Sequence, residues 1–147
     1  MRLRGKSIVV TGSTGIAESS ALRFAAEGAY VFIISRRPEG CQSLADKISS
    51  AGHECGWASA DLTDASAAED AFGRFDAERS VLDGLLAVAG GSGRRFGDGP
   101  AHEMDLGGWA KTQQINGDPT FLAASHALKR MKGRGGSIAI ITSVLAD

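Results

Sequence analysis

Apolar stretches rich in valine and isoleucine alternate along the chain with stretches in which apolar and polar residues recur at a helical spacing. The apolar stretches predict strands near residues 7–11, 29–35, 53–59, 82–89 and 137–143. The stretches between them predict helices near residues 15–27, 39–51, 64–78 and 103–132. Buried strands that alternate with helices are typical of a parallel sheet covered on both faces. The pattern therefore predicts an α/β fold, with ligands bound at the carboxyl ends of the strands.

Single residues predict where several of these elements end. Gly28 and Gly52 follow helical stretches, at the position where a left-handed cap residue ends a helix. Asp64 is expected to cap the amino end of the third helix. Within the long fourth helical stretch, Pro119 cannot donate a backbone hydrogen bond, so we expect a kink or a break there. Residues 90–100 are rich in glycine and predict a loop rather than a helix or strand.

Length and charge restrict the class of protein. The chain has 147 residues, 43% of them hydrophobic, and a net charge of −1, which predicts one globular domain over residues 1–147. Because no basic field is present, we expect no nucleic-acid partner, and the pair Arg94-Arg95 is interpreted as a solvated part of a loop. No apolar stretch is long enough for a secretory signal or a membrane span, so we expect a cytoplasmic protein without a membrane partner. The cysteines and histidines lack metal-ligand spacing, so we expect no metal site.

The turn at residues 11–15, with the sequence TGSTG, connects the first strand to the first helix. Glycine lacks a Cβ, so backbone N–H groups in this turn can approach an anion, and the positive end of the helix dipole favours a phosphate. The residues expected to bind the diphosphate of a dinucleotide are Gly12, Ser13, Thr14, Gly15 and Ile16. The alternative is a tight turn that binds no ligand.

The end of the second strand predicts which dinucleotide binds. In NAD-binding domains a carboxylate near this position accepts hydrogen bonds from the ribose 2′-hydroxyl. This chain has Ser35, Arg36 and Arg37 there, and no acidic residue before Glu39. Guanidinium groups form charge-assisted bidentate contacts with a phosphate, so NADP is expected in preference to NAD. The alternative interpretation is a solvated basic turn.

Five motifs, in order along the whole chain, resemble those of the short-chain dehydrogenase/reductase family. TGSTGIA is similar to the family's glycine turn, ADLTD at 60–64 to the segment with an adenine-contacting Asp, and AVAGG at 87–91 to its NNAG segment. INGDPTFLAASHALKRM resembles the helix that carries the catalytic Asn, and GGSIAIITSV resembles the strand that ends in the catalytic Ser. The resemblance implies a Rossmann-like, doubly wound parallel sheet of five strands in the order 3-2-1-4-5, with helices on both faces.

The resemblance also implies contacts to the coenzyme and to other molecules. Asp61 and Leu62 would flank the adenine, and the backbone of Ala89 and Gly90 would lie close to the adenine ribose. The cofactor would be NADP(H), and the substrate a small carbonyl compound or alcohol. The long fourth helix would join copies of the chain into a homo-oligomer.

The catalytic set implied by the resemblance is incomplete in this chain. Ser143 would hydrogen-bond the substrate oxygen, and Asn116 would hold a water of a proton relay through its backbone. The family also uses a Tyr as general acid/base, with a Lys four residues on, but the only tyrosine here is Tyr30 and Ile34 follows it at that spacing. Without that phenol, no group is positioned to supply the proton that accompanies the hydride. We therefore expect the coenzyme-binding portion of an NADP-dependent oxidoreductase, with its C-terminal part missing after the fifth strand, that is inactive alone.

Two other hypotheses stay open. One makes the chain a non-catalytic protein that binds NADP or a partner and assembles through an uncovered apolar face. The other makes it one half of a split reductase, whose companion chain supplies the Tyr and the Lys. Two motif positions also depart from the family: its third glycine falls on Ala17 or Glu18, and its paired Asn are Ala87 and Val88. We expect packing alone to hold the segment at residues 87–88 to its neighbours.

Overall fold

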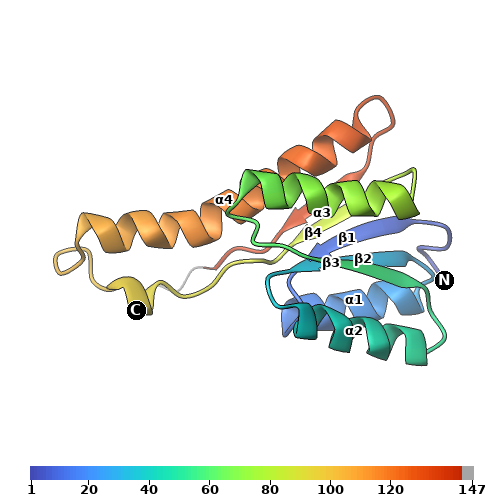
Figure 1. Ribbon diagram of the computed structural model, residues 1–147, viewed down its shortest axis with the longest axis horizontal. Coiled ribbons are helices and arrows are strands. Elements are labelled where there is room, and N and C mark those ends of the chain that lie inside the picture. Colours follow the sequence, from blue (N-terminus) through green and yellow to red (C-terminus); the bar gives the residue numbers. More distant parts are fainter. Residues whose placement is uncertain (144–147) are drawn as a thin grey trace.

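The computed structural model describes residues 1–143, which form one parallel sheet of five strands. The strands are β1 (Ser7–Thr11), β2 (Tyr30–Ser35), β3 (Cys55–Ser59), β4 (Gly84–Ala87) and β5 (Ser137–Ile140). Their order in the sheet is β3-β2-β1-β4-β5, so the predicted fold class and strand order are confirmed (Figure 1). The last two strands are shorter than the apolar stretches that predicted them, because the ladder between them ends at the pair Ala87 and Ile140.

The α-helices cover the two faces of the sheet (Figure 1). They are α1 (Ile16–Ala26), α2 (Pro38–Ser50), α3 (Ala65–Glu78) and α4 (Leu106–Met131). The first two lie on one face of the sheet, and α3 and α4 lie on the other (Figure 1). The helices α1, α2 and α4 each connect two strands that are parallel neighbours in the sheet, whereas α3 crosses from the edge strand β3 to β4 on the other side of β1.

Successive residues of β1 belong to the two different faces. Val9 packs with Phe32 and Phe75 in the core beneath α3 and α4, whereas Val10 packs in the core beneath α1 and α2. The rings of Phe32 and Phe75 meet edge to face, with their centroids 5.6 Å apart. Because side chains alternate along a strand and both faces are covered, the central strands have apolar residues at nearly every position.

The predicted ends of three elements are confirmed. The side chain of Asp64 caps α3 by accepting hydrogen bonds from the backbone N–H groups of Ser66, at 2.8 Å, and Ala67, at 3.1 Å. Gly28 and Gly52 have φ angles of 91° and 82°, in the left-handed region expected of residues that follow a helix. The local sequence therefore determines where these elements stop.

Pro119 does not end α4. The helix continues from Leu106 to Met131 with Pro119 buried inside it, so of the two expected outcomes, a kink or a break, the break does not occur. The ribbon of α4 changes direction near its middle (Figure 1). One missing backbone hydrogen bond is tolerated here because Ala123 and Ala127, in the turns that follow, are buried in the core.

The second half of α4 is attached to α3 by polar and aromatic contacts. The guanidinium of Arg130 donates to both carboxylate oxygens of Asp76, at 2.8 and 2.5 Å. The buried ring of His126 stacks on Phe72, with a centroid distance of 5.0 Å. These contacts fix the position of the carboxyl half of α4 against α3.

The loop between β4 and α4 contains one short element that was not expected. Residues Arg94–Phe96 form a single turn of 3₁₀ helix, so the prediction of a loop without any element over residues 90–100 is corrected. This turn packs closely on α4, because a Cβ at Gly93 would overlap the hydroxyl of Thr112, and a Cβ at Gly108 would overlap the carbonyl of Phe96. The 3₁₀ turn and the first half of α4 therefore form one packed unit.

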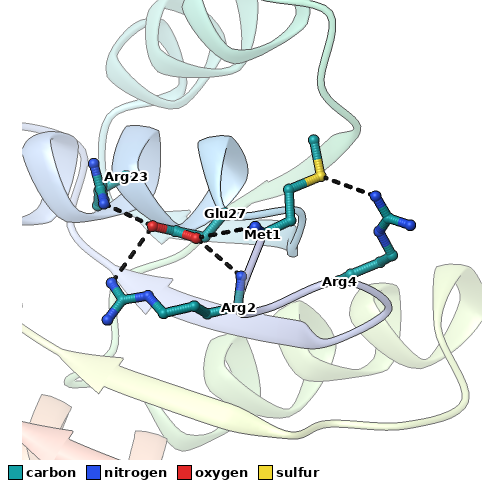
Figure 2. A network of polar contacts seen from close by, with 5 residues as sticks. All are labelled: Met1, Arg2, Arg4, Arg23 and Glu27. Carbon is teal, nitrogen blue, oxygen red and sulfur yellow. Dashed lines mark hydrogen bonds and ion pairs between the residues drawn. The ribbon is translucent and has the colours of Figure 1, made fainter.

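Glu27 attaches the amino-terminal segment to the end of α1 (Figure 2). One carboxylate oxygen accepts a hydrogen bond from the backbone N–H of Arg2 at 2.9 Å and lies 3.7 Å from the amino group of Met1. The other accepts from the guanidinium of Arg23 at 2.6 Å. The hydrogen bond from the Arg2 backbone, followed by the nearby positive charges, lowers the pKa of the Glu27 carboxyl. We call these four residues the Glu27 cluster; it lies at the amino ends of the strands, because α1 runs back from the carboxyl end of β1.

Candidate functional site

A cavity of about 870 Å³ lies at the carboxyl ends of β1, β2, β3 and β4 and is bounded by α4. Ten of the predicted coenzyme-binding residues line it: Gly12, Ser13, Thr14, Ser35, Arg36, Arg37, Asp61, Leu62, Ala89 and Gly90. Gly15 and Ile16 do not line the cavity; they lie where α1 begins. The structure therefore brings together segments that are far apart in the sequence, at the edge of the sheet where the fold predicts a ligand.

The glycine turn is tight at one glycine and open at the other. Gly12 has a φ of 102°, and a Cβ there would lie 3.1 Å from the Cβ of Ala17. Gly15 has a φ of 59°, has open space where a Cβ would be, and precedes α1 without any side chain that caps the helix. The first N–H groups of α1 therefore have no side-chain partner in the turn and can donate hydrogen bonds to an anion.

The carboxylate of Glu18 lies in the first turn of α1, where a negative charge would oppose a diphosphate. Lys47 of α2 donates a hydrogen bond to it at 2.5 Å, so the carboxylate is neutralised by the neighbouring helix. Glu18 is absent from the residues that line the cavity. The turn at residues 11–15 thus fits a phosphate group, although it differs from the family's three-glycine pattern.

Ser13 lines the cavity, and its side chain connects the glycine turn to two other segments. Its side chain is buried, donates a hydrogen bond to the hydroxyl of Ser35 at 3.2 Å and packs against Gly40 of α2. This contact joins the glycine turn to the end of β2. It therefore fixes the position of the two arginines that follow Ser35.

Arg36 and Arg37 follow β2 and are exposed at the cavity. No carboxylate within residues 1–143 lies within 4 Å of either guanidinium. The hydroxyl of Ser59 donates to the backbone carbonyl of Arg36 at 3.0 Å, which holds the turn in place. The two side chains can therefore pair with a negatively charged ligand group.

The segment after β3 offers one carboxylate. Asp61 accepts hydrogen bonds from the backbone N–H of Thr63 at 3.0 Å and from its hydroxyl at 2.9 Å. The backbone hydrogen bond, supported by the positive charges of Arg36 and Lys111, lowers the pKa of the Asp61 carboxyl. The side chain of Leu62 is buried in the core, so only its backbone can contact a ligand.

The segment after β4 is held by a hydroxyl, which the sequence analysis missed. The buried hydroxyl of Thr11 accepts hydrogen bonds from the backbone N–H groups of Val88, at 2.9 Å, and Ala89, at 3.0 Å. The expectation that packing alone holds this segment is therefore wrong. The sequence shows a polar residue, Thr11, at the carboxyl end of β1 after three apolar residues, but not the partners of its hydroxyl.

The side chain of Asn116 joins α4 to the same segment. Its amide oxygen accepts from the N–H of Gly91 at 2.9 Å, and its amide nitrogen donates to the carbonyl of Gly91 at 3.0 Å. The hydroxyl of Thr120 donates to the backbone carbonyl of Asn116 at 3.0 Å. Ser143 is exposed and follows β5, and neither it nor Asn116 lines the cavity. Their catalytic roles stay predictions.

Further residues that line the cavity were not identified from the sequence. They are Ala17, Ile34, Ala60, Thr63, Val88, Gly91, Ser92, Arg95, Lys111, Ile115 and Pro119. Arg95, which was interpreted as a solvated loop residue, is exposed, and it also lines the cavity. Lys111, Ile115 and Pro119 recur every four residues, which is the spacing of one helix face.

The described segment contains neither a helix suited to a membrane nor a cluster of metal ligands. None of the helices formed by residues 1–143 is long and apolar enough to cross a membrane. Within the same residues, no three or more His, Cys, Asp or Glu side chains form a group that could hold a metal ion.

Comparison with known proteins gives consistent relatives. Residues 6–147 match the family model described as short chain dehydrogenase. The chain is 34% identical over 139 residues to a cis-4-hydroxycyclohexanecarboxylate dehydrogenase of Sinomonas cyclohexanicum, covering 93% of this chain and 54% of the relative. It is 27% identical to a 2,3-dihydro-2,3-dihydroxybenzoate dehydrogenase of Bacillus subtilis, covering 96% and 53%.

Solved structures give the same result. The citronellol catabolism dehydrogenase AtuB of Pseudomonas aeruginosa superposes with a TM-score of 0.87 at 27% identity, covering 98% of this chain and 58% of that protein. A short-chain dehydrogenase/reductase from Serratia marcescens superposes with a TM-score of 0.85 at 29% identity, covering 97% and 57%. The chain therefore spans a little over half the length of these relatives.

Proposed function

Because the chain belongs to the short-chain dehydrogenase family, whose members use NAD or NADP, we propose that it binds NADP(H) as the coenzyme-binding portion of an oxidoreductase. The substrate would be a small carbonyl compound or alcohol. One observation carries the choice of NADP: Arg36 and Arg37 line the cavity at the end of β2 and have no carboxylate partner within residues 1–143. A guanidinium cannot accept a hydrogen bond from a ribose 2′-hydroxyl, but it donates two to a phosphate.

The other residues of the cavity fit the remaining parts of this coenzyme. The N–H groups that begin α1 suit the diphosphate, and Asp61 is an acceptor for the amino group of the adenine. The hydroxyl of Thr11 keeps Val88 and Ala89 in place, where the backbone of Ala89 and Gly90 would lie close to the adenine ribose. The coenzyme, when bound, supplies or accepts the hydride.

Catalysis also requires a proton donor or acceptor beside the substrate. We assign substrate binding to Ser143 and a place in the proton relay to Asn116. The tyrosine of the chain, Tyr30, begins β2 at the end of the strand opposite the cavity, and its hydroxyl donates to Glu78. Burial, followed by the hydrogen bond to Glu78, raises the pKa of Tyr30. Residues 1–147 are therefore proposed to bind coenzyme without reducing a substrate on their own.

The names of the Sinomonas and Bacillus relatives describe cyclic alcohols that carry a carboxylate. This supports cyclic alcohols and their ketones as the first substrate class to test with a chain that carries the missing Tyr and Lys. The two relatives cover nearly the whole of this chain, so the choice rests on sequence similarity across the entire coenzyme portion.

A second candidate function is a non-catalytic NADP-binding protein, or one half of a split reductase, that assembles through α4. Large apolar side chains of this helix are exposed: Leu106 by 80%, Trp109 by 52%, Phe121 by 70% and Leu128 by 59%. Exposed apolar surface of this kind favours association, and it supports a homo-oligomer. Light scattering measures the mass in solution. A monomer without affinity for NADPH would exclude the assembling NADP binder, and reductase activity from these residues alone would exclude both variants.

The test of the coenzyme proposal is a titration of the chain with NADPH and NADH. We expect the double variant Arg36→Ala/Arg37→Ala to bind NADPH about 100-fold more weakly, because two charge-assisted contacts are lost. Its NADH affinity should change by less than about threefold. Arg74→Ala, which removes an exposed arginine of α3 outside the cavity, is the matched control and should change neither. An equal loss for both coenzymes would contradict the assignment of the 2′-phosphate.

A further inference from the structure

Positive side chains line the cavity on two of its walls. Arg36 and Arg37 extend from the end of β2, whereas Arg95 comes from the 3₁₀ turn and Lys111 from α4. Among the described residues that line the cavity, Asp61 is the one acidic side chain. The cavity therefore carries a net positive charge, to which the helix side contributes as well as the sheet side.

Packing of α4 on the 3₁₀ turn directs Lys111 toward the cavity. Lys111 lies on the same face of α4 as Ile115 and Pro119, and all three line the cavity. The close contact between Gly108 and Phe96 fixes the rotation of this half of α4 against the 3₁₀ turn. The aromatic ring of Phe96 lies 4.6 Å from the guanidinium carbon of Arg95 and 5.8 Å from the Lys111 ammonium. Both cations of this wall thus share one aromatic support.

Lys111 has no charged partner of its own close by. Its ammonium donates a hydrogen bond to the neutral amide oxygen of Gln114 at 2.7 Å, and no carboxylate within residues 1–143 lies within 4 Å of it. The acidic side chain at the cavity is Asp61, whose pKa is lowered first by the hydrogen bonds from Thr63 and then by the positive charges of Arg36 and Lys111. The Asp61 carboxylate therefore feels one cation from the end of β2 and a second from α4.

A phosphorylated coenzyme makes this arrangement significant. The 2′-phosphate adds about two negative charges to the adenosine half of the molecule. Such a group would be repelled by the ionised Asp61 at the same cavity. A cation on the α4 side offsets that repulsion and adds a donor. An arginine pair at the end of β2 supplies charge from one side only.

We propose that Lys111 is a coenzyme-binding residue that, together with Arg36, binds the adenosine 2′-phosphate and so contributes to the selection of NADP. This inference rests on the proposed coenzyme function. It adds a specificity residue from α4, whereas the glycine turn and the arginine pair follow β1 and β2. Lys111 is exposed and makes no contact to the core, so its replacement leaves the fold intact.

The experiment measures equilibrium binding of NADPH, NADH and 2′,5′-ADP to the 147-residue chain by calorimetry. For Lys111→Gln we expect NADPH and 2′,5′-ADP to bind about tenfold more weakly and NADH to bind within about twofold of the unchanged chain. Lys111→Arg keeps the charge and should restore most of the affinity. Lys129→Gln, a charge removal further along α4 and away from the cavity, is the matched control.

The outcomes separate this inference from the function on which it rests. If the unchanged chain binds neither NADPH nor 2′,5′-ADP, the coenzyme proposal itself fails. If the unchanged chain binds both and Lys111→Gln binds them equally well, the assignment of Lys111 is overturned while the coenzyme proposal survives. Equal weakening of NADPH and NADH would also overturn it, because Lys111 would then act on the diphosphate or on the whole molecule. Circular dichroism and the unfolding midpoint confirm that each variant is folded.

Discussion

Arginine side chains gather at two ends of the sheet, and their contacts differ. At the amino ends of the strands, Arg2 and Arg23 both contact the carboxylate of Glu27 (Figure 2). At the carboxyl ends, Arg36 and Arg37 line the cavity without a carboxylate partner within residues 1–143. A paired arginine satisfies a local charge and attaches one segment to another. Two neighbouring guanidinium groups without a carboxylate partner repel each other, and a bound anion offsets this repulsion. The first group of arginines therefore stabilises the fold, whereas the second can pair with an anionic ligand.

The largest expected difference between the two ends is in stabilisation by coenzyme. A ligand present at 100 times its Kd stabilises a protein that binds it only when folded by about 2.7 kcal/mol. We expect this gain in the unchanged chain and in Glu27→Gln, whereas Arg36→Ala/Arg37→Ala should lose most of it at the same NADPH concentration. Scanning calorimetry with and without NADPH measures it. If Glu27→Gln lost as much of the gain as the double variant, the two ends would not be functionally distinct.

Salt should separate the two ends less strongly. Raising the ionic strength from about 0.05 M to about 0.5 M screens exposed charges, so we expect NADPH affinity to fall by about tenfold and NADH affinity to fall less. The unfolding midpoint without coenzyme should move by only about 2 °C, because exposed ion pairs contribute little to stability. Fluorescence titrations and thermal melts at the two ionic strengths give both quantities. A salt effect of the same size on both coenzymes would count against a specific contact to the 2′-phosphate.

The smallest effect is expected from Glu27 itself, and it depends on pH. The folded-state pKa of Glu27 lies below its ordinary value of 4.5, so its contribution to stability is full above pH 4.5 and is lost as the pH falls through the lowered value. At pH 7, Glu27→Gln should lower the unfolding midpoint by no more than about 4 °C. The difference between the variant and the unchanged chain should shrink toward pH 3. A difference that grows on acidification would mean that the ion pairs are not its source.

The alternation of apolar and amphipathic stretches was sufficient to predict a parallel sheet with helices on both faces, whereas the order of the strands followed from the resemblance to the family. The glycine turn and the arginine pair were also predictable, because each is a short contiguous motif whose chemistry depends on its own residues. Local capping was equally accessible, as Asp64 illustrates. For Pro119 the sequence left a kink and a break open, and packing of the helix on the core, which outweighs one lost backbone hydrogen bond, excludes the break.

The helix side of the cavity could not be predicted for a physical reason. In the sequence, Lys111 is one of several polar residues of the helix, and nothing in their composition indicates which of them faces the cavity. Only the rotation of α4 about its own axis brings Lys111 to the cavity, and that rotation is set by the contact of Gly108 with Phe96. The 3₁₀ turn and α4 can approach this closely only because Gly108 lacks a Cβ. A pattern of apolar residues does not predict such an approach. The role of the Thr11 hydroxyl was missed because its partners, Val88 and Ala89, lie in the segment after β4, far away in the sequence.

Pro119 also marks the point at which α4 changes its partners. It has no N–H to donate, so the carbonyl of Ile115 lacks the helical hydrogen bond that its neighbours have. After Pro119, α4 is fixed to α3 through Arg130 and Asp76. Before Pro119, the helix contains Lys111 and packs on the 3₁₀ turn. The proline therefore lies between the half of α4 that is fixed to α3 and the half that is fixed to the loop after β4 through Asn116 and Gly91. The direction of the helix can change at this residue, so each half follows the surface on which it packs.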